Sequence, residues 1–334
     1  MKIGLLNKPF FYFCRLFYNA LFDTINLMTF DRKTLVVPDD TKFEEKTIVT
    51  KGDVVIGDRC LIQFGIKTDG RIFVGEHVVI DGDLEATNDI RADIFTRIRG
   101  NVKSGGNVYF GEKVAVNGKL SLSGDLDVGD SVEIDQGFEA KGWINIRSPI
   151  PVVIYIFIYL MQMMKMGHSE EIDRILSEIE ENDGDTIPIS ETFLFIPNSS
   201  IIGVQKSKID YNVRVGKKSS LLGNYEIKGN AFIEDHSVMH GTLKSTGDVY
   251  CGKKTTIHGN INSGGDVKIE DKTKIAGDIN AAKIFLAKNS MVGGELFAKN
   301  GISFYSSSKK DAQEKIQRFE NETDIVDEVD DMLE

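Results

Sequence analysis

Apolar residues recur every 18 positions along most of this chain. When the sequence is written in rows of 18 that begin at Gly52, each row carries apolar residues at its third and fifth places. The third place holds Val54, Ile72, Ile90, Val108, Leu126 and Ile144, and the fifth holds Ile56, Val74, Ala92, Phe110, Val128 and Ile146. Alternation at every second residue indicates β-strands, and the phase shifts after every six residues indicate three strands per turn. The pattern predicts a triangular β-solenoid with rungs about 4.8 Å apart.

A second run repeats the same frame from Tyr211, with one turn of 17 residues before Ala282. It is offset from the first run by 159 residues, and the offset also relates Val37-Pro38-Asp39 to Ile196-Pro197-Asn198. We therefore expect an all-β chain with two parallel β-helices of about six turns each, every one opened by a similar turn whose proline blunts the first strand edge. Glycine recurs at place thirteen of both runs, and we attribute this to corners that need backbone angles other residues resist. A sandwich of short strands does not predict such a register.

The flanking sequence completes the predicted organisation. We expect an amphipathic helix over residues 1–33, β-helices over 34–147 and 191–304, a helical insert over 148–190 and an acidic tail over 305–334. The first segment suits a membrane interface, and its candidate contact residues are Phe10, Phe11, Phe13, Phe17 and Phe22. A helix that caps or flanks the first solenoid is the alternative.

An uncharged apolar run occupies residues 150–164 of the insert. It is shorter than the roughly 20 residues that a bilayer span needs. We favour a helical hairpin that packs on a solenoid flank or on a partner copy, with shallow membrane contact as the alternative.

Charge and cysteine content exclude several classes of function. The net charge is −11, and Tyr305 to Glu334 hold ten acidic and four basic residues. No basic stripe is present to neutralise phosphates, so we expect no nucleic-acid partner. Cys14, Cys60 and Cys251 are scattered and lack ligand spacing, which favours a reducing, cytoplasmic location without disulfides.

Few residues suggest catalysis or metal binding. The enzymatic alternative is a hexapeptide-repeat acyltransferase, whose histidine would have to be His77, His168, His236, His240 or His258. We expect His240 and His258, both at place twelve, to stack one rung apart as a surface pair rather than to hold a metal. Acidic or amide residues at place two invite a calcium-ladder interpretation, but one carboxylate per turn is a weak cage, so turn capping is favoured. We predict no enzyme activity, cofactor or metal site.

The row from Gly70 to Ala86 and the segments Gly247 to Gly252 and Ile257 to Ile261 resemble the bactofilin family of polymer-forming cytoskeletal proteins. The resemblance covers about 95 residues in each half. It implies a right-handed β-helix, nucleotide-independent self-assembly through the helix ends and, in many members, membrane attachment through a short N-terminal segment. This chain departs from the family pattern in its two runs, its insert and its two opening prolines.

The predicted function is therefore a structural scaffold that self-associates through its β-helix ends, at the cytoplasmic face of the membrane. The candidate self-association residues are Ile144, Ile146, Ile302 and Phe304, in the last rows of the two runs. Partners would be further copies, the membrane surface and other bactofilin-like proteins. A membrane-bound regulator that does not itself polymerise is the other alternative.

Overall fold

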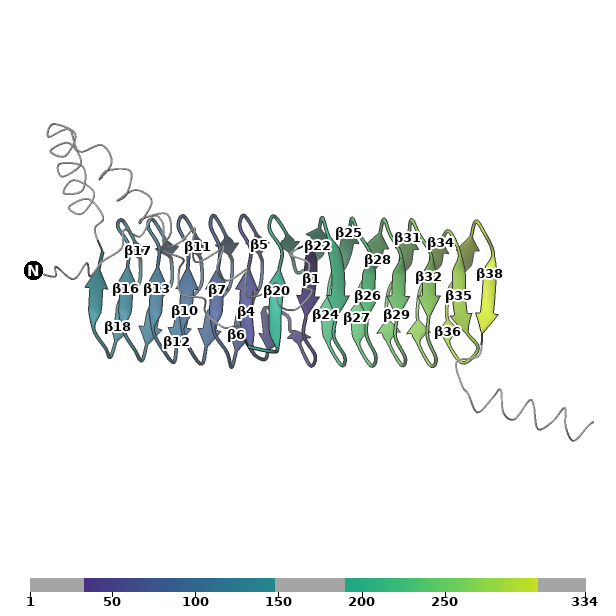
Figure 1. Ribbon diagram of the computed structural model, residues 1–334, viewed down its shortest axis with the longest axis horizontal. Helices are drawn as coiled ribbons and strands as arrows, with labels where there is room; N and C mark the ends of the chain where they lie inside the picture. The colour runs from purple at the N-terminus through teal and green to yellow at the C-terminus, as the bar shows by residue number, and fades with distance from the viewer. Residues whose placement is uncertain (1–32, 148–189, 306–334) are drawn as a thin grey trace, which may run out of the picture.

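The computed structural model describes residues 33–147 and 190–305, and all regular structure within them is β-strand (Figure 1). The predicted N-terminal helix, helical insert and acidic tail lie outside the described residues, apart from their boundary positions. The described strands form three long sheets that wrap around one apolar core. The chain is therefore a β-solenoid of about 12 rungs, as two of the sheets have 12 strands.

One sheet, called here the long sheet, has 14 strands. In spatial order they are β19 (Ile144–Ile146), β16 (Leu126–Val128), β13 (Val108–Phe110), β10 (Ile90–Ala92), β7 (Ile72–Val74), β4 (Asp53–Ile56), β20 (Phe193–Ile196), β1 (Thr34–Val37), β23 (Asn212–Val215), β26 (Ala231–Ile233), β29 (Val249–Cys251), β32 (Val267–Ile269), β35 (Ile284–Ala287) and β38 (Ile302–Tyr305).

The two other sheets have 12 strands each. The first runs β17 (Glu133–Ile134), β14 (Ala115–Val116), β11 (Arg97–Ile98), β8 (Val79–Ile80), β5 (Leu61–Ile62), β21 (Ile201–Ile202), β22 (Lys206–Ile209), β25 (Asn224–Ile227), β28 (Leu243–Ser245), β31 (Ile261–Ser263), β34 (Ile279–Ala281) and β37 (Leu296–Ala298). The second runs β18 (Phe138–Ala140), β15 (Leu120–Leu122), β12 (Val102–Ser104), β9 (Leu84–Ala86), β6 (Gly65–Thr68), β3 (Thr47–Thr50), β2 (Lys42–Phe43), β24 (Ser220–Leu222), β27 (Val238–His240), β30 (Thr256–Ile257), β33 (Lys274–Ile275) and β36 (Met291–Val292).

The predicted 18-residue register is confirmed. Val54 pairs with Ile72, and Val249 pairs with Val267, each pair in parallel on adjacent rungs. The 17-residue turn is absorbed outside the strands, because Val267 still pairs with Ile284. The inward columns are almost completely buried and form one continuous cluster along the rod.

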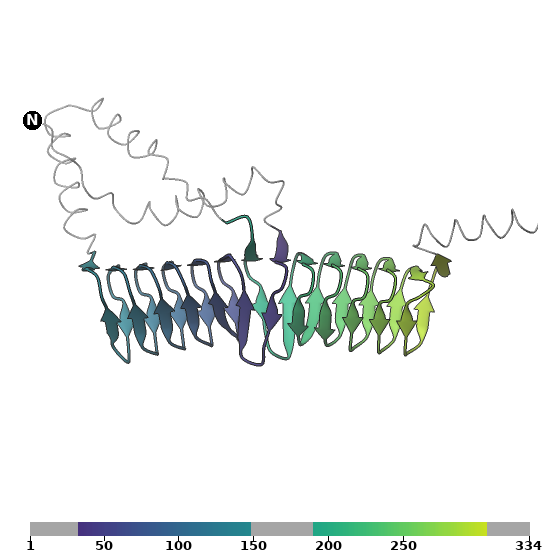
Figure 2. The ribbon, with the colours of Figure 1, turned by 90° about the horizontal axis from the view of Figure 1, so that it is seen from below.

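The prediction of two separate β-helices is wrong, because the two runs form one rod (Figures 1 and 2). Each run begins at the middle and proceeds outward, so that β19 and β38 lie at opposite ends. We call residues 47–147 the first half and residues 206–305 the second half. Both free ends of the rod are consequently the C-terminal ends of their halves.

The opening turns of the two halves are exchanged at the middle. The first arm, residues 33–43, carries β1 and β2, which pair in parallel with β23 and β24 of the second half. The second arm, residues 190–202, carries β20 and β21, which pair in parallel with β4 and β5 of the first half. The arms meet where β1 and β20 pair antiparallel, with Val36 opposite Phe195. Each half is thus completed by the arm that precedes the other half.

The exchange follows an internal pseudo-twofold relation with the same 159-residue offset. Asp39 accepts the backbone N–H of Lys217 at 2.7 Å, and its counterpart Asn198 accepts that of Asp58 at 3.1 Å. Pro38 and Pro197 precede these residues and therefore lie in the middle of the rod. Their predicted role at a free strand edge is wrong, since the strands they follow have neighbours on both sides.

The reason for the glycines at place thirteen also differs from the prediction. A Cβ atom at Gly82 would lie 2.2 Å from the backbone nitrogen of Gly65, which no real side chain tolerates. Gly82 itself has no positive φ, whereas His77 and Lys113, at place eight, both have φ of 55°. Close approach between rungs therefore selects most of these glycines, and ordinary residues occupy the left-handed corner.

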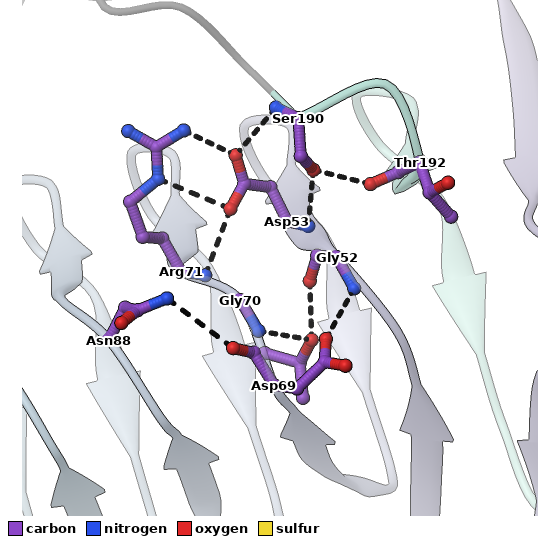
Figure 3. A network of polar contacts seen from close by, with 9 residues as sticks. Gly52, Asp53, Asp69, Gly70, Arg71, Asn88, Ser190 and Thr192 are labelled. Atoms are coloured by element: carbon purple, nitrogen blue, oxygen red, sulfur yellow. Dashed lines mark hydrogen bonds and ion pairs between the residues drawn. The ribbon is translucent and has the colours of Figure 1, made fainter.

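A buried ion pair holds the second arm in place (Figure 3). Asp53 begins β4 and pairs with the guanidinium of Arg71 on the next rung. Its carboxylate also accepts the N–H of Ser190 at 3.0 Å, and its own N–H donates to the Ser190 hydroxyl at 2.9 Å. Burial opposes ionisation of Asp53, but the hydrogen bonds from Arg71 and Ser190 outweigh it and lower its pKa.

Replacement of Asp53 by Asn should destabilise the protein by about 1–3 kcal/mol at neutral pH, because Arg71 loses its charged partner. A lowered folded-state pKa adds stability that is present above the unfolded value and is lost as pH falls through the folded one. The difference between wild type and Asp53→Asn should therefore shrink from neutral pH to about pH 3 in urea unfolding. The control is Asp53→Asn/Arg71→Asn, which copies Asn212 and Asn230 of the second half. An equal difference at both pH values would contradict the assignment.

Candidate assembly surfaces at the rod ends

Each end of the rod is a last rung that pairs with another rung on its inner side only. Strands β17, β18 and β19 form the first end, and β36, β37 and β38 form the second. Among the described residues, each of these strands has a neighbour on one side only. Their outer backbone groups are a template for pairing with a further strand.

The first end exposes the core columns of its half. One rung inward, Leu126 and Val128 are 2% and 9% exposed. In the last rung, Ile144 and Ile146 of the same columns are 51% and 73% exposed. Phe138 and Trp143 are exposed beside them. The end is therefore an apolar cross-section of the core.

The second end also exposes the core columns of its half. Ile284 and Leu286 are 0% and 7% exposed, whereas Ile302 and Phe304 in the next rung are 38% and 63% exposed. Met291 and Phe297 on β36 and β37 are exposed as well, but they face outward from the side of the rod, as do their exposed partners Lys274 and Asn280 one rung inward. The sequence prediction placed Ile144, Ile146, Ile302 and Phe304 in these rungs but omitted the four other residues. Of these four, only Trp143 stands in the last row of a run; Phe138, Met291 and Phe297 stand in the preceding rows, whose last strands complete the same end rungs.

Polar contacts fix the last strands against the rungs beneath them. In β38, the Tyr305 hydroxyl donates to the carbonyl of Ile269 at 3.0 Å. Burial, followed by the nearby Glu270 carboxylate, raises the pKa of Tyr305, so its hydroxyl remains a donor at neutral pH. At the first end, Arg147 forms an ion pair with Asp127 on the outer side of the long sheet. Both end strands are thus held in register.

The described histidines lie at corners or on the outer face of the solenoid. His77 and His236 occupy left-handed corners, with φ of 55° and 62°. The rings of His240 and His258 stack with centroids 4.8 Å apart, as predicted. Within the described parts of the chain, no group of three or more histidine, cysteine or acidic residues has an arrangement that could hold a metal. His168 lies outside the described residues.

The two inward cysteines are core residues. Cys60 and Cys251 are buried, and burial raises the pKa of each thiol to about 12. Both thiols therefore stay protonated at neutral pH and lack the reactivity of a thiolate.

The acidic and amide residues at place two cap the adjacent rung. Asp89 accepts the N–H of Asn107 at 2.8 Å, and Asn107 accepts that of Asp125 at 2.8 Å. The second half repeats this arrangement, in which Asp248 accepts the N–H of Asp266 at 2.8 Å. These side chains satisfy backbone donors at the corners, as the turn-capping interpretation predicted.

These features define a parallel β-solenoid repeat protein with two open, apolar ends. No protein-family model, curated protein or solved structure matches this chain.

The predicted membrane-contact residues Phe10, Phe11, Phe13, Phe17 and Phe22 lie outside the described residues. Within residues 33–147 and 190–305, no helix is long and apolar enough to cross a bilayer.

Proposed function

We propose that this protein is a structural scaffold of the bactofilin type that self-associates end to end. The observation that carries the proposal is the exposure of the core columns at the last rungs, by Ile146 at one end and Phe304 at the other. An aliphatic or aromatic side chain that becomes fully buried contributes about 1.5–3 kcal/mol. Contact between the ends of two copies would bury several such residues and would pair three strand edges. Both effects favour association.

The direction of the halves determines how two copies would pair. Both free ends are C-terminal, so an end-to-end contact brings two outermost rungs together with opposite strand directions. The antiparallel pairing of β1 with β20 is the precedent within the chain, where two N-terminal ends meet. Contact of the first end of one copy with the second end of the next repeats indefinitely and would give a linear polymer.

Electron microscopy of the full-length protein tests this function. Fourteen strands in the long sheet and a spacing of about 4.8 Å give an axial repeat of roughly 65–70 Å for directly stacked copies. Filaments or short rows with that repeat would support the proposal. Isolated single rods at tens of micromolar protein would overturn it.

A role at the cytoplasmic face of a membrane extends this proposal and is supported by the aromatic residues before residue 30. Deletion of residues 1–30 should reduce co-sedimentation with anionic liposomes by at least about tenfold, since apolar area and basic charge both contribute to such binding. The matched control is a deletion of residues 306–334, which should leave co-sedimentation unchanged. Equal pelleting of both truncated proteins would argue that the first segment contacts protein instead.

We infer a structural rather than an enzymatic role for the histidines as well. A hexapeptide-type acyltransferase would need an accessible histidine in a substrate cleft, and His240 is the candidate, since it is exposed and lines an open hollow with Lys46 and Leu222. The stacking of His240 on His258 and the left-handed corners at His77 and His236 are explained by the solenoid geometry. Perturbation of His236 or His240 by an acyl donor in an NMR titration would argue for the enzyme.

A further inference from the structure

A buried apolar patch lies on the outer face of the long sheet. Phe195, Val55 and Phe73 occupy consecutive strands in register, on β20, β4 and β7. Their side chains alternate with the core columns and therefore point away from the core. Even so, Phe195 is 1%, Val55 2% and Phe73 5% exposed. Something other than the core excludes water from this patch.

The second half supplies an internal comparison. Phe232 is the counterpart of Phe73 under the 159-residue offset and stands on the same face of the same sheet. It is 43% exposed. Val36, the next residue beyond Phe195 in this column, is partly exposed, and Arg214 after it is exposed. The cover therefore lies over the first half and ends at the middle of the rod.

The described strands do not provide this cover. They form a single-walled tube, and in both ribbon views no described element crosses its outer side (Figures 1 and 2). The guanidinium of Arg71 lies 5.2 Å from the ring centroid of Phe73 and shields part of one residue. It does not account for three neighbouring side chains that are all nearly inaccessible. The cover must come from another part of the chain.

Residues 148–189 connect two described residues that both lie at the long sheet. The preceding residue, Arg147, follows β19 and is paired with Asp127 on the outer face of the long sheet. The next described residue, Ser190, is held by Asp53 at the start of β4, in the interior of the same sheet (Figure 3). Six strand spacings separate β19 from β20, about 29 Å. An extended chain covers that distance with roughly nine residues, so most of the segment is free to pack on the face.

The chemistry of this segment matches the patch. Residues 150–164 contain no charged side chain and are rich in isoleucine, valine, tyrosine and methionine. We propose that the outer face formed by Phe195, Val55 and Phe73 is the docking surface for residues 150–164 of the same chain. The second half has no returning segment between its strands, which explains why Phe232 stays exposed. In this arrangement residues 150–164 pack on the rod and do not contact a membrane.

Site-specific photo-crosslinking tests this assignment. A p-benzoylphenylalanine placed at position 73 of the full-length protein should crosslink to peptides from residues 150–164, as identified by mass spectrometry after digestion. The same probe at position 232 is the matched control and should give at least tenfold less of that product. Mixing isotopically labelled and unlabelled protein distinguishes a crosslink within one chain from one between copies.

Each alternative product would overturn the proposal. Crosslinks from position 73 to residues 1–32 would assign the cover to the N-terminal segment, and crosslinks only between differently labelled chains would assign it to a second copy. Absence of any crosslink would show that the face is not covered. None of these outcomes depends on end-to-end assembly, because the last rungs are unchanged in both probe proteins.

Discussion

Replacement of Ile302 by Lys together with Phe304 by Glu is expected to dissolve end-to-end assemblies while the rod stays folded. Both residues lie in the last rung and are 38% and 63% exposed, so the free chain loses less packing than it would at the buried positions of the same columns, Ile284 and Leu286. In an assembled copy, two charges would be buried in an apolar contact. Loss of about 1.5–3 kcal/mol for each side chain raises the concentration needed for assembly at least about 100-fold.

Sedimentation velocity measures this effect, and circular dichroism during thermal unfolding checks that the fold is intact. The matched control is Phe232→Glu, which introduces a charge at an exposed aromatic residue on the side of the rod. The control should sediment as the wild type does. Unchanged sedimentation of the Ile302→Lys/Phe304→Glu variant would remove the second end from the contact.

Separation of the two halves is expected to abolish the folding of each half alone. A fragment of residues 1–189 lacks the second arm, so the core side chains of β4 and β5 lose the rung that covers them. A fragment of residues 190–334 lacks the first arm and loses the same cover on β23 and β24. Because each arm completes the other half, the co-expressed fragments should form a one-to-one complex with a dissociation constant below about 0.1 µM.

Solubility of the single fragments and size-exclusion chromatography of the pair provide the measurement. Removal of residues 1–46 from the first fragment deletes β1 and β2 and should weaken the complex at least about 100-fold, since it removes the pairing with β23 and β24. Two soluble, independently folded fragments that do not associate would contradict the exchanged arrangement.

Local periodicity was sufficient for the greater part of the fold. The columns that begin with Val54 and Val213 specify which residues face the core, and a spacing of 18 specifies which strands are neighbours. Both properties depend only on residues one turn apart, so no long-range information is needed. The place-thirteen glycines were recognised from their position alone. The reason for these glycines could not be predicted, because the close approach of Gly82 to Gly65 arises only when the rungs pack on one another.

The candidate site was only partly predictable. The last row of a repeat is the row that lacks a successor, and this marked Ile146 and Phe304 as end residues. The contact of Tyr305 with Ile269 spans 36 residues and crosses two rungs. The outward patch at Phe73 was also hidden in the sequence, because Phe73 and Phe232 occupy equivalent places and differ only in what covers them.

By itself, the sequence determined the rung, its register, its buried columns and the two runs related by 159 residues. Only the tertiary structure decided that these runs form one rod with exchanged arms. The opening strands of both runs have nearly the same pattern, so the repeat cannot distinguish an arm that stacks on its own half from one that stacks on the other. That choice is visible only in the parallel pairing of β1 with β23 and of β20 with β4, which joins residues far apart in the chain.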